Sequence, residues 1–118
     1  MLLSHAEFCA SDQVQKIREM EKELGIFKAL SDETRLKIVL FLINGERCVC
    51  EIMPYINRAQ STTSLQLRKL ENLGVVSSRR KGKSVYYKII SPDILKVLKC
   101  LKMDKYTKDI PRKKIQCP

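Results

Sequence analysis

Two cysteines one residue apart, Cys48 and Cys50, are the residues of this chain whose type and spacing point most clearly to chemistry. Two thiolates bind soft ions such as arsenic(III), antimony(III), cadmium or lead far better than magnesium or calcium. On a regular helix, residues two apart point about 200° apart, because one turn takes about 3.6 residues. The pair can therefore chelate an ion only if Cys48 lies before a helix or if the helix deforms.

Of the other three cysteines, Cys100 and Cys117 are weaker candidates for such chemistry. The chain begins with a segment too short and too soon polar for a signal peptide, and no apolar run approaches the roughly 20 residues of a membrane span. We therefore expect a cytoplasmic protein without a membrane partner, whose thiols lie in a reducing compartment. An odd count of five cysteines also argues against a closed disulfide framework. We expect Cys100 to be a small core residue and Cys117 to lie in a tail.

Charge and composition favour a nucleic-acid partner over catalysis. The 118 residues carry 23 Lys and Arg against 13 Asp and Glu, a formal net charge of +10, and 44% hydrophobic residues allow one core. His5 is the only histidine, and the chain has neither a Ser/His/Asp set nor a glycine-rich phosphate loop. We expect that the protein is not an enzyme and that it needs no cofactor.

The hydrophobic periodicity predicts four helices before residue 74. A first helix, capped by Asp12, carries one narrow apolar stripe that suits packing on another helix, including one from a second chain. The stripe consists of Val14, Ile17, Met20, Leu24, Phe27 and Leu30. A central core helix from Glu33 to Ile43, capped by Asp32, is followed by a short helix within Glu46–Ile56. After a turn at Asn57–Ala59, a fourth helix runs from Gln60 to Leu73 and stops at Gly74.

The pattern then changes to that of a β-hairpin and one last helix. Strands at Val75–Arg79 and Ser84–Ile90 flank a tip that contains Gly82. Ser91 caps the last helix, with Ile94, Leu98 and Leu101 facing inward. We expect a flexible segment over 1–11, one domain over 12–103 and a basic, disordered tail over 104–118. The order α-α-α-α-β-β-α is that of a winged helix-turn-helix.

Two parts of this fold could contact double-stranded DNA. On the fourth helix, Thr63, Leu67 and Leu70 would face the core and leave polar side chains for base edges and phosphates. The hairpin would present a cationic wing, with one tyrosine of the pair Tyr86 and Tyr87 packed inward and the other on a phosphate. The expected DNA contacts are Gln60, Ser61, Thr62, Ser64, Gln66, Arg68, Lys69, Arg79, Arg80, Lys81, Lys83 and Tyr87.

The order of several short motifs resembles the ArsR/SmtB family of metal-responsive repressors. The motifs are residues 32–38 (DETRLKI), 45–52 (GERCVCEI), 60–70 (QSTTSLQLRKL), 73–76 (LGVV) and 79–87 (RRKGKSVYY). The resemblance implies a homodimer that pairs through its first and last helices and represses an operator of two-fold symmetry. The family often has His where Gln66 stands here, which affects base preference rather than DNA binding itself.

The resemblance also bears on the third ligand that a trigonal metalloid site needs. In the arsenic-sensing branch a third cysteine follows the second by three residues, and here that position is Met53, a poorer thioether ligand. In the cadmium and lead branch further thiolates come from the N-terminal segment of the partner chain, which points to Cys9. The family's zinc-type site is not expected, since Leu95–Met103 holds none of its ligands. Thiol oxidation or persulfide sensing, no sensor at all, and an interaction module without a DNA role remain alternatives.

Overall fold

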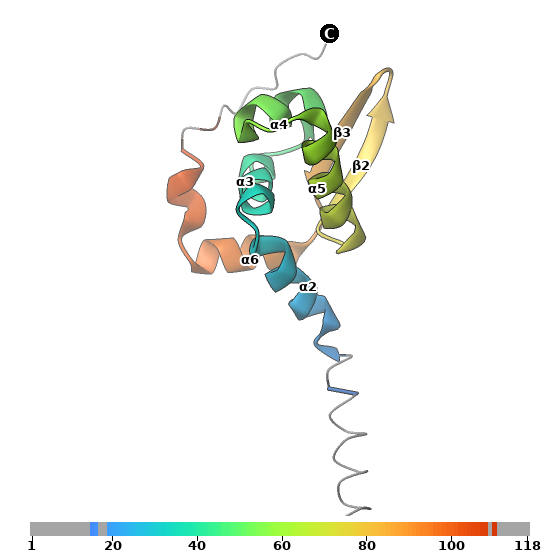
Figure 1. The fold of residues 1–118 in the computed structure, drawn as a ribbon. Coiled ribbons are helices and arrows are strands. Elements are labelled where there is room, and N and C mark those ends of the chain that lie inside the picture. The colour runs from blue at the N-terminus through green and yellow to red at the C-terminus, as the bar shows by residue number, and fades with distance from the viewer. Residues whose placement is uncertain (1–14, 17–18, 109, 111–118) are drawn as a thin grey trace, which may run out of the picture.

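The fold, taken from a computed structural model, is a helical body with a β-hairpin that projects beside one of its helices (Figure 1). The structure describes residues 15–16, 19–108 and 110. The elements are α2 (Glu21–Leu30), α3 (Glu33–Leu42), β1 (Arg47–Cys48), α4 (Val49–Ile56), α5 (Gln60–Asn72), β2 (Val76–Lys81), β3 (Ser84–Ile89), α6 (Pro92–Cys100) and the 3₁₀ helix η1 (Met103–Tyr106). This is the predicted winged helix-turn-helix, in which α4 and α5 form the helix-turn-helix and β2–β3 the wing.

Local signals in the sequence place most of the helix ends. The Asp32 side chain accepts a hydrogen bond from the Arg35 backbone N–H at 3.1 Å, and Ser91 accepts one from Ile94 at 3.4 Å. Each bond satisfies an N–H group that lacks a partner in the first turn of its helix. Gly74, with φ of +76°, follows α5, and Asn57, with φ of 54°, ends α4. The caps predicted at Asp32 and Ser91 and the stop predicted at Gly74 are confirmed.

The core lies around α3, as its nearly continuous apolar sequence predicts. Residues 38–42 of this helix are all buried. Helix α5 contributes Thr63, Leu67 and Leu70, each fully buried, so the core-facing side predicted for this helix is confirmed. The opposite side of α5 therefore faces solvent.

The short helix predicted within Glu46–Ile56 is confirmed as α4, and a strand that was not predicted precedes it. Arg47 and Cys48 form this strand, β1, and α4 begins at Val49. β1 pairs antiparallel with β3, so the sheet has three strands in the order β1-β3-β2. A two-residue strand depends on a partner far along the chain, and its own sequence therefore gives little sign of it.

Three predictions about the C-terminal part are wrong. Cys100 is exposed, and Leu101, at 63% exposure, does not face inward, although Ile94 and Leu98 do. Residues 104–106 belong to η1, where a disordered tail was expected to begin at 104. Ile110 is buried in the core at 4% exposure. The ordered fold therefore extends beyond the boundary expected at 103.

Three residues of the apolar stripe predicted for the first helix face away from the body of the chain, whereas its last residue, Leu30, packs against the core. Met20, Leu24 and Phe27 are 54%, 47% and 64% exposed, while Ile26 and Ala29 are buried instead. The expected cap Asp12, the stripe residues Val14 and Ile17, and segment 1–11 lie outside the residues that the structure describes. Among those that it does describe, no helix is both long and apolar enough to cross a bilayer.

Candidate functional site

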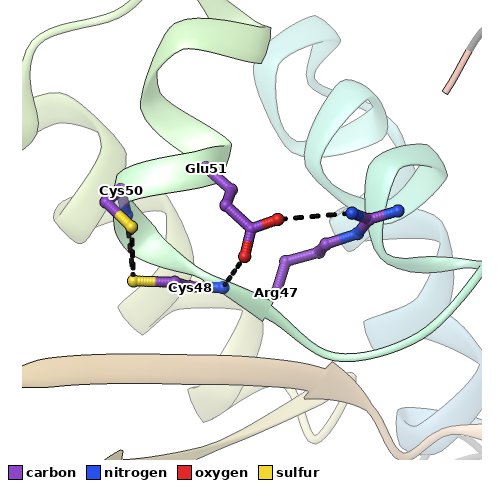
Figure 2. Close-up of polar contacts among 4 residues, drawn as sticks. All are labelled: Arg47, Cys48, Cys50 and Glu51. Carbon is purple, nitrogen blue, oxygen red and sulfur yellow. Dashed lines mark hydrogen bonds and ion pairs between the residues drawn. The ribbon is translucent and has the colours of Figure 1, made fainter. Parts of the chain in front are cut away.

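The cysteine pair lies at the start of α4, where Cys48 is the N-cap residue (Figure 2). Its backbone is extended, with φ of −75° and ψ of 150°, and its Sγ accepts a hydrogen bond from the Cys50 N–H at 3.4 Å. Because Cys48 precedes the helix, its side chain turns toward that of Cys50, and the two sulfur atoms lie 2.7 Å apart. The backbone condition that the sequence set, namely that Cys48 precede the helix, is met.

A buried ion pair holds this helix start in place. Glu51 Oε1 accepts a hydrogen bond from the Cys48 N–H at 3.2 Å, which completes a capping box, and Glu51 Oε2 lies 3.3 Å from Arg47 Nη1. The Arg47 and Glu51 side chains are 2% and 1% exposed, and the guanidinium lies 4.9 Å from the centroid of the Phe41 ring. Removal of either charge would cost the other this buried contact, so the pair helps to fix the Cys48 backbone.

The two sulfurs fit a soft ion as part of a ligand set rather than as a whole one. Zn–S bonds of about 2.3 Å in a tetrahedral site would separate two sulfurs by about 3.8 Å, so the pair must open by about 1 Å to hold an ion of this size. Within the described part of the chain, no group of three or more His, Cys, Asp or Glu side chains could hold a metal ion. Cys9 and Cys117 lie outside the described residues, and exposed Cys100 is on α6.

A cavity of about 320 Å³ joins the cysteine pair to both elements that were expected to contact DNA. Its walls include the two cysteines and Met53 from the α4 region, Gln60 and Ser64 from α5, and Lys83 to Val85 with Tyr87 from the wing. An ion or molecule bound to the sulfurs would therefore lie next to side chains from the first turns of α5 and from the wing.

Helix α5 is the second helix of the helix-turn-helix and is called the reading helix below. It exposes most of the residues predicted to contact DNA. Gln60, Ser61, Arg68 and Lys69 are exposed, and Thr62, Ser64 and Gln66 are half-buried. Gln66 differs from the others, because its Oε1 accepts a hydrogen bond from Arg35 Nη1 at 3.1 Å. Arg35 also donates to the backbone carbonyls of Lys28, at 2.9 Å, and Ala29, at 3.3 Å. One guanidinium thus connects α2, α3 and α5, and Gln66 helps to hold the reading helix in place.

The wing carries the expected cluster of cations, but one of them is already engaged. Arg79 Nη2 and Nε lie 2.6 and 2.7 Å from the two carboxylate oxygens of Glu46, and this contact raises the pKa of Arg79. Arg79 also lies 5.2 Å above the Tyr86 ring. The remaining predicted wing contacts, Arg80, Lys81 and Lys83, are exposed.

The two tyrosines of β3 divide between the core and the wing. The Tyr87 ring packs partly against the core, and burial, followed by the charge of Glu71, raises the pKa of its hydroxyl. Tyr86 lies under Arg79 on the other side of the strand. The phosphate contact expected of Tyr87 stays a prediction, made by a hydroxyl whose ring is held by the core.

Three residues of this site were not singled out from the sequence: Glu46, Glu51 and Arg35. Glu51 follows Cys48 by three residues, which is the spacing of a capping box, and a cysteine in the place of Ser or Thr obscured that signal. Glu46 and Arg35 act through Arg79 and Gln66, more than 30 positions away along the chain. No local pattern could have revealed these two contacts.

Comparisons with known proteins agree with this architecture. The family described as "Bacterial regulatory protein, arsR family" matches residues 32–78. A cadmium resistance transcriptional regulatory protein of Listeria innocua is 49% identical over 75 residues, which are 63% of this chain and 63% of that protein. The match therefore spans less than two thirds of that relative's length.

One further relative and one solved structure match more of their own length. An uncharacterized HTH-type transcriptional regulator of Methanocaldococcus jannaschii is 36% identical over 84 residues, 70% of this chain and 94% of the relative. The solution structure of a homodimeric winged helix-turn-helix DNA-binding domain from Mycobacterium bovis superposes with a TM-score of 0.68 at 28% identity. The superposition covers 78% of this chain and 85% of that one.

Proposed function

The chain belongs to the ArsR family of bacterial regulatory proteins, and from this premise we propose that it is a DNA-binding repressor that a soft metal or metalloid ion releases from its operator. The observation that carries this proposal is the position of the cysteine pair. Cys48 and Cys50 lie with their sulfurs 2.7 Å apart, in one cavity with the first turns of α5 and the wing. The proposed sensor and the proposed DNA-contacting surface are thus neighbours.

DNA binding rests on the exposed polar face of α5 and on the cationic wing. The first turns of α5 would enter the major groove, where Gln60, Ser61 and Ser64 can reach base edges. Arg80, Lys81 and Lys83 would contact phosphates, as would Arg68 and Lys69 from the reading helix. The net charge of +10 per chain favours such an anionic partner.

The proposed inducer site combines two chains. In the reduced protein Cys48 and Cys50 would supply two thiolates, and Cys9 of a second chain would supply the third, as in the branch of the family that senses cadmium and lead. An ion held by three sulfurs is soft, which favours arsenic(III), antimony(III), cadmium or lead. A ligand that prefers the DNA-incompetent state weakens operator binding by the same factor by which DNA weakens ligand binding.

The second chain would pack on the apolar face that the single chain leaves exposed. Leu24 and Phe27 of α2, together with Leu95 and Leu101 at α6, present large hydrophobic side chains to solvent. Exposed apolar surface of this kind is typical of a subunit interface. A homodimer paired through its first and last helices would bury this surface and place two reading helices on an operator of two-fold symmetry.

A metal titration tests the sensor directly. Reduced protein is titrated with arsenite and with cadmium while the thiolate-to-metal absorbance is recorded, for the wild type and for Cys48→Ser, Cys50→Ser and Cys9→Ser, with Cys100→Ser as the matched control. We expect a band that is lost in the Cys48 and Cys50 variants, weakened in Cys9→Ser and kept in Cys100→Ser. If neither ion gives a band with the wild type, the metal-sensing part of the proposal is wrong.

A further inference from the structure

A guanidinium of α3 joins the reading helix to the end of α2. Arg35 donates from Nη1 to Gln66 Oε1 of α5 at 3.1 Å. Its Nη2 and Nε donate to the backbone carbonyls of Lys28, at 2.9 Å, and Ala29, at 3.3 Å, in the last turn of α2. Carbonyl groups in the last turn of a helix lack a partner within that helix and are open to such a donor. The bond to Gln66 therefore ties α5 to the end of α2.

A second contact joins the same two helices. Gly25 of α2 is buried, and a Cβ atom at this position would lie 3.7 Å from the backbone oxygen of Leu73 and 3.9 Å from a methyl carbon of its side chain. Leu73 is the C-cap residue of α5 and follows Gln66 by seven positions, so both residues lie on one side of the helix. Along α2, Gly25 precedes Lys28 and Ala29 by about one turn. Two separate points of contact fix the angle between α2 and α5 as well as their distance.

The exposed side of α2 carries part of the proposed dimer interface. Leu24 and Phe27 are exposed there, whereas Gly25 and Ala29 are buried. In the proposed homodimer α2 packs against the partner, so the connection from α2 to α5 sets how far apart the two reading helices lie. That separation has to match the separation of two half-sites on DNA, about 34 Å for one helical turn or a multiple of it. A dimer in which α5 turned freely on α2 would accept several half-site spacings.

We propose that Arg35 and Gln66 are positioning residues that set the separation of the two reading helices, so that Gln66 determines half-site spacing in place of reading a base. This inference rests on the proposed function, because it requires a homodimer on an operator of two-fold symmetry. Gln66 was expected among the DNA contacts, but its side chain is half-buried and its Oε1 is bound by Arg35. Loss of that oxygen would release α5 from α2 and leave the exposed start of α5, at Gln60 and Ser61, unchanged.

Operators of altered spacing test this role, with Gln66→Met as the variant and Gln60→Met as the matched control. Methionine is similar to glutamine in length and has no oxygen for Arg35, and Gln60 is exposed at the start of the same helix. Footprinting of the wild type on the duplex upstream of its own coding sequence locates the half-sites. Fluorescence anisotropy then gives the dissociation constants for this duplex, for one with an extra base pair between the half-sites and for one with a single half-site.

We expect Gln66→Met to lower the preference for the native over the lengthened duplex by about tenfold, which corresponds to one hydrogen bond to a charged group. Its affinity for the single half-site should stay within about twofold of the wild-type value. Gln60→Met should weaken binding to all three duplexes alike and keep the spacing preference. Gln66→Glu, which keeps an oxygen that can accept from Arg35, should also keep the wild-type preference. If Gln66→Met weakens all three duplexes by the same factor, Gln66 is a DNA contact and the inference is overturned.

Residual dipolar couplings of the backbone amides give a second readout without DNA. In the wild type one alignment tensor should describe both α2 and α5, whereas in Gln66→Met the couplings of α5 should be scaled down relative to those of α2. Couplings that are the same in the two proteins would overturn the inference, whatever the variant does on DNA. A wild type that binds no duplex would instead contradict the proposed function, and the couplings would still decide whether Gln66 holds α5 on α2.

Discussion

Cys48 combines two roles within one residue, as a ligand candidate and as the cap of α4. Its Sγ accepts the Cys50 N–H, and its own N–H is bound by Glu51. A serine hydroxyl can form the same cap bond but is a hard ligand with little affinity for soft ions. Stability and ion binding can therefore be separated at this position.

We expect the free energy of unfolding of Cys48→Ser to lie within about 0.5 kcal/mol of the wild-type value. Cys48→Ala loses the cap, and its free energy of unfolding should fall by about 1 kcal/mol. Both variants should lose the cadmium absorbance band, because each lacks one sulfur. Urea denaturation followed by circular dichroism measures the first effect and absorbance titration the second. Equal stability of the alanine and serine variants would show that the Sγ contact contributes nothing to the helix start.

The residue scale also shows what could be predicted from the sequence. Asp32, Ser91 and Gly74 act through neighbours three or four positions away, so their roles follow from local spacing. The requirement that Cys48 lie before the helix also followed from geometry alone. The exposure of Leu101 and Cys100 did not follow, because the end of α6 is decided by how it meets η1 and the core.

At the scale of elements, the wing should account for much of the salt dependence of DNA binding. Arg80, Lys81 and Lys83 are exposed, so each can displace a counter-ion from the DNA backbone. We expect operator affinity to fall steeply with salt, and each single change to Gln to reduce the slope of log K against log salt by about 1. Fluorescence anisotropy between about 50 and 200 mM salt measures this slope. A slope that all three substitutions leave unchanged would contradict the wing contact.

Arg35 connects three elements, and its geometry makes lysine a poor replacement. The guanidinium contacts Lys28, Ala29 and Gln66 at once, which a single ammonium group cannot do. We expect Arg35→Lys to lower the free energy of unfolding by about 1–2 kcal/mol, since carbonyl groups at the end of α2 lose their partner. Urea denaturation measures this change. Lys37→Arg, at an exposed position of the same helix, is the control and should leave stability unchanged.

The three-stranded sheet marks the limit of prediction at this scale. The hairpin was evident from β-branched and aromatic residues around Gly82, and its strands are confirmed as Val76–Lys81 and Ser84–Ile89. The third strand, Arg47–Cys48, owes its conformation to pairing with Tyr86 and Tyr87, some 40 positions away. This non-local pairing places the thiol pair against the wing, which the linear sequence could not show.

At the scale of the whole molecule, the exposed apolar side chains of α2 and α6 predict a dimer. Phe27 is 64% exposed, although a large apolar side chain is usually covered. We expect Phe27→Glu to shift the protein from dimer to monomer and to weaken operator binding, because two linked reading helices bind far better than one. Sedimentation equilibrium determines the mass, with Ile90→Glu, at a half-exposed apolar residue just after β3, as the control. A wild-type protein that is monomeric throughout the concentration range would contradict this interface.

The most direct test of the central claim is release from DNA. The binding of a duplex from the region upstream of the protein's own coding sequence is followed by fluorescence anisotropy, with and without cadmium, for the wild type and for Cys48→Ser/Cys50→Ser. We predict that cadmium weakens wild-type binding by about 5- to 150-fold and has no effect on the double variant, which still binds the duplex. Equal release of the two proteins by cadmium, or a wild type that never releases, would contradict the account.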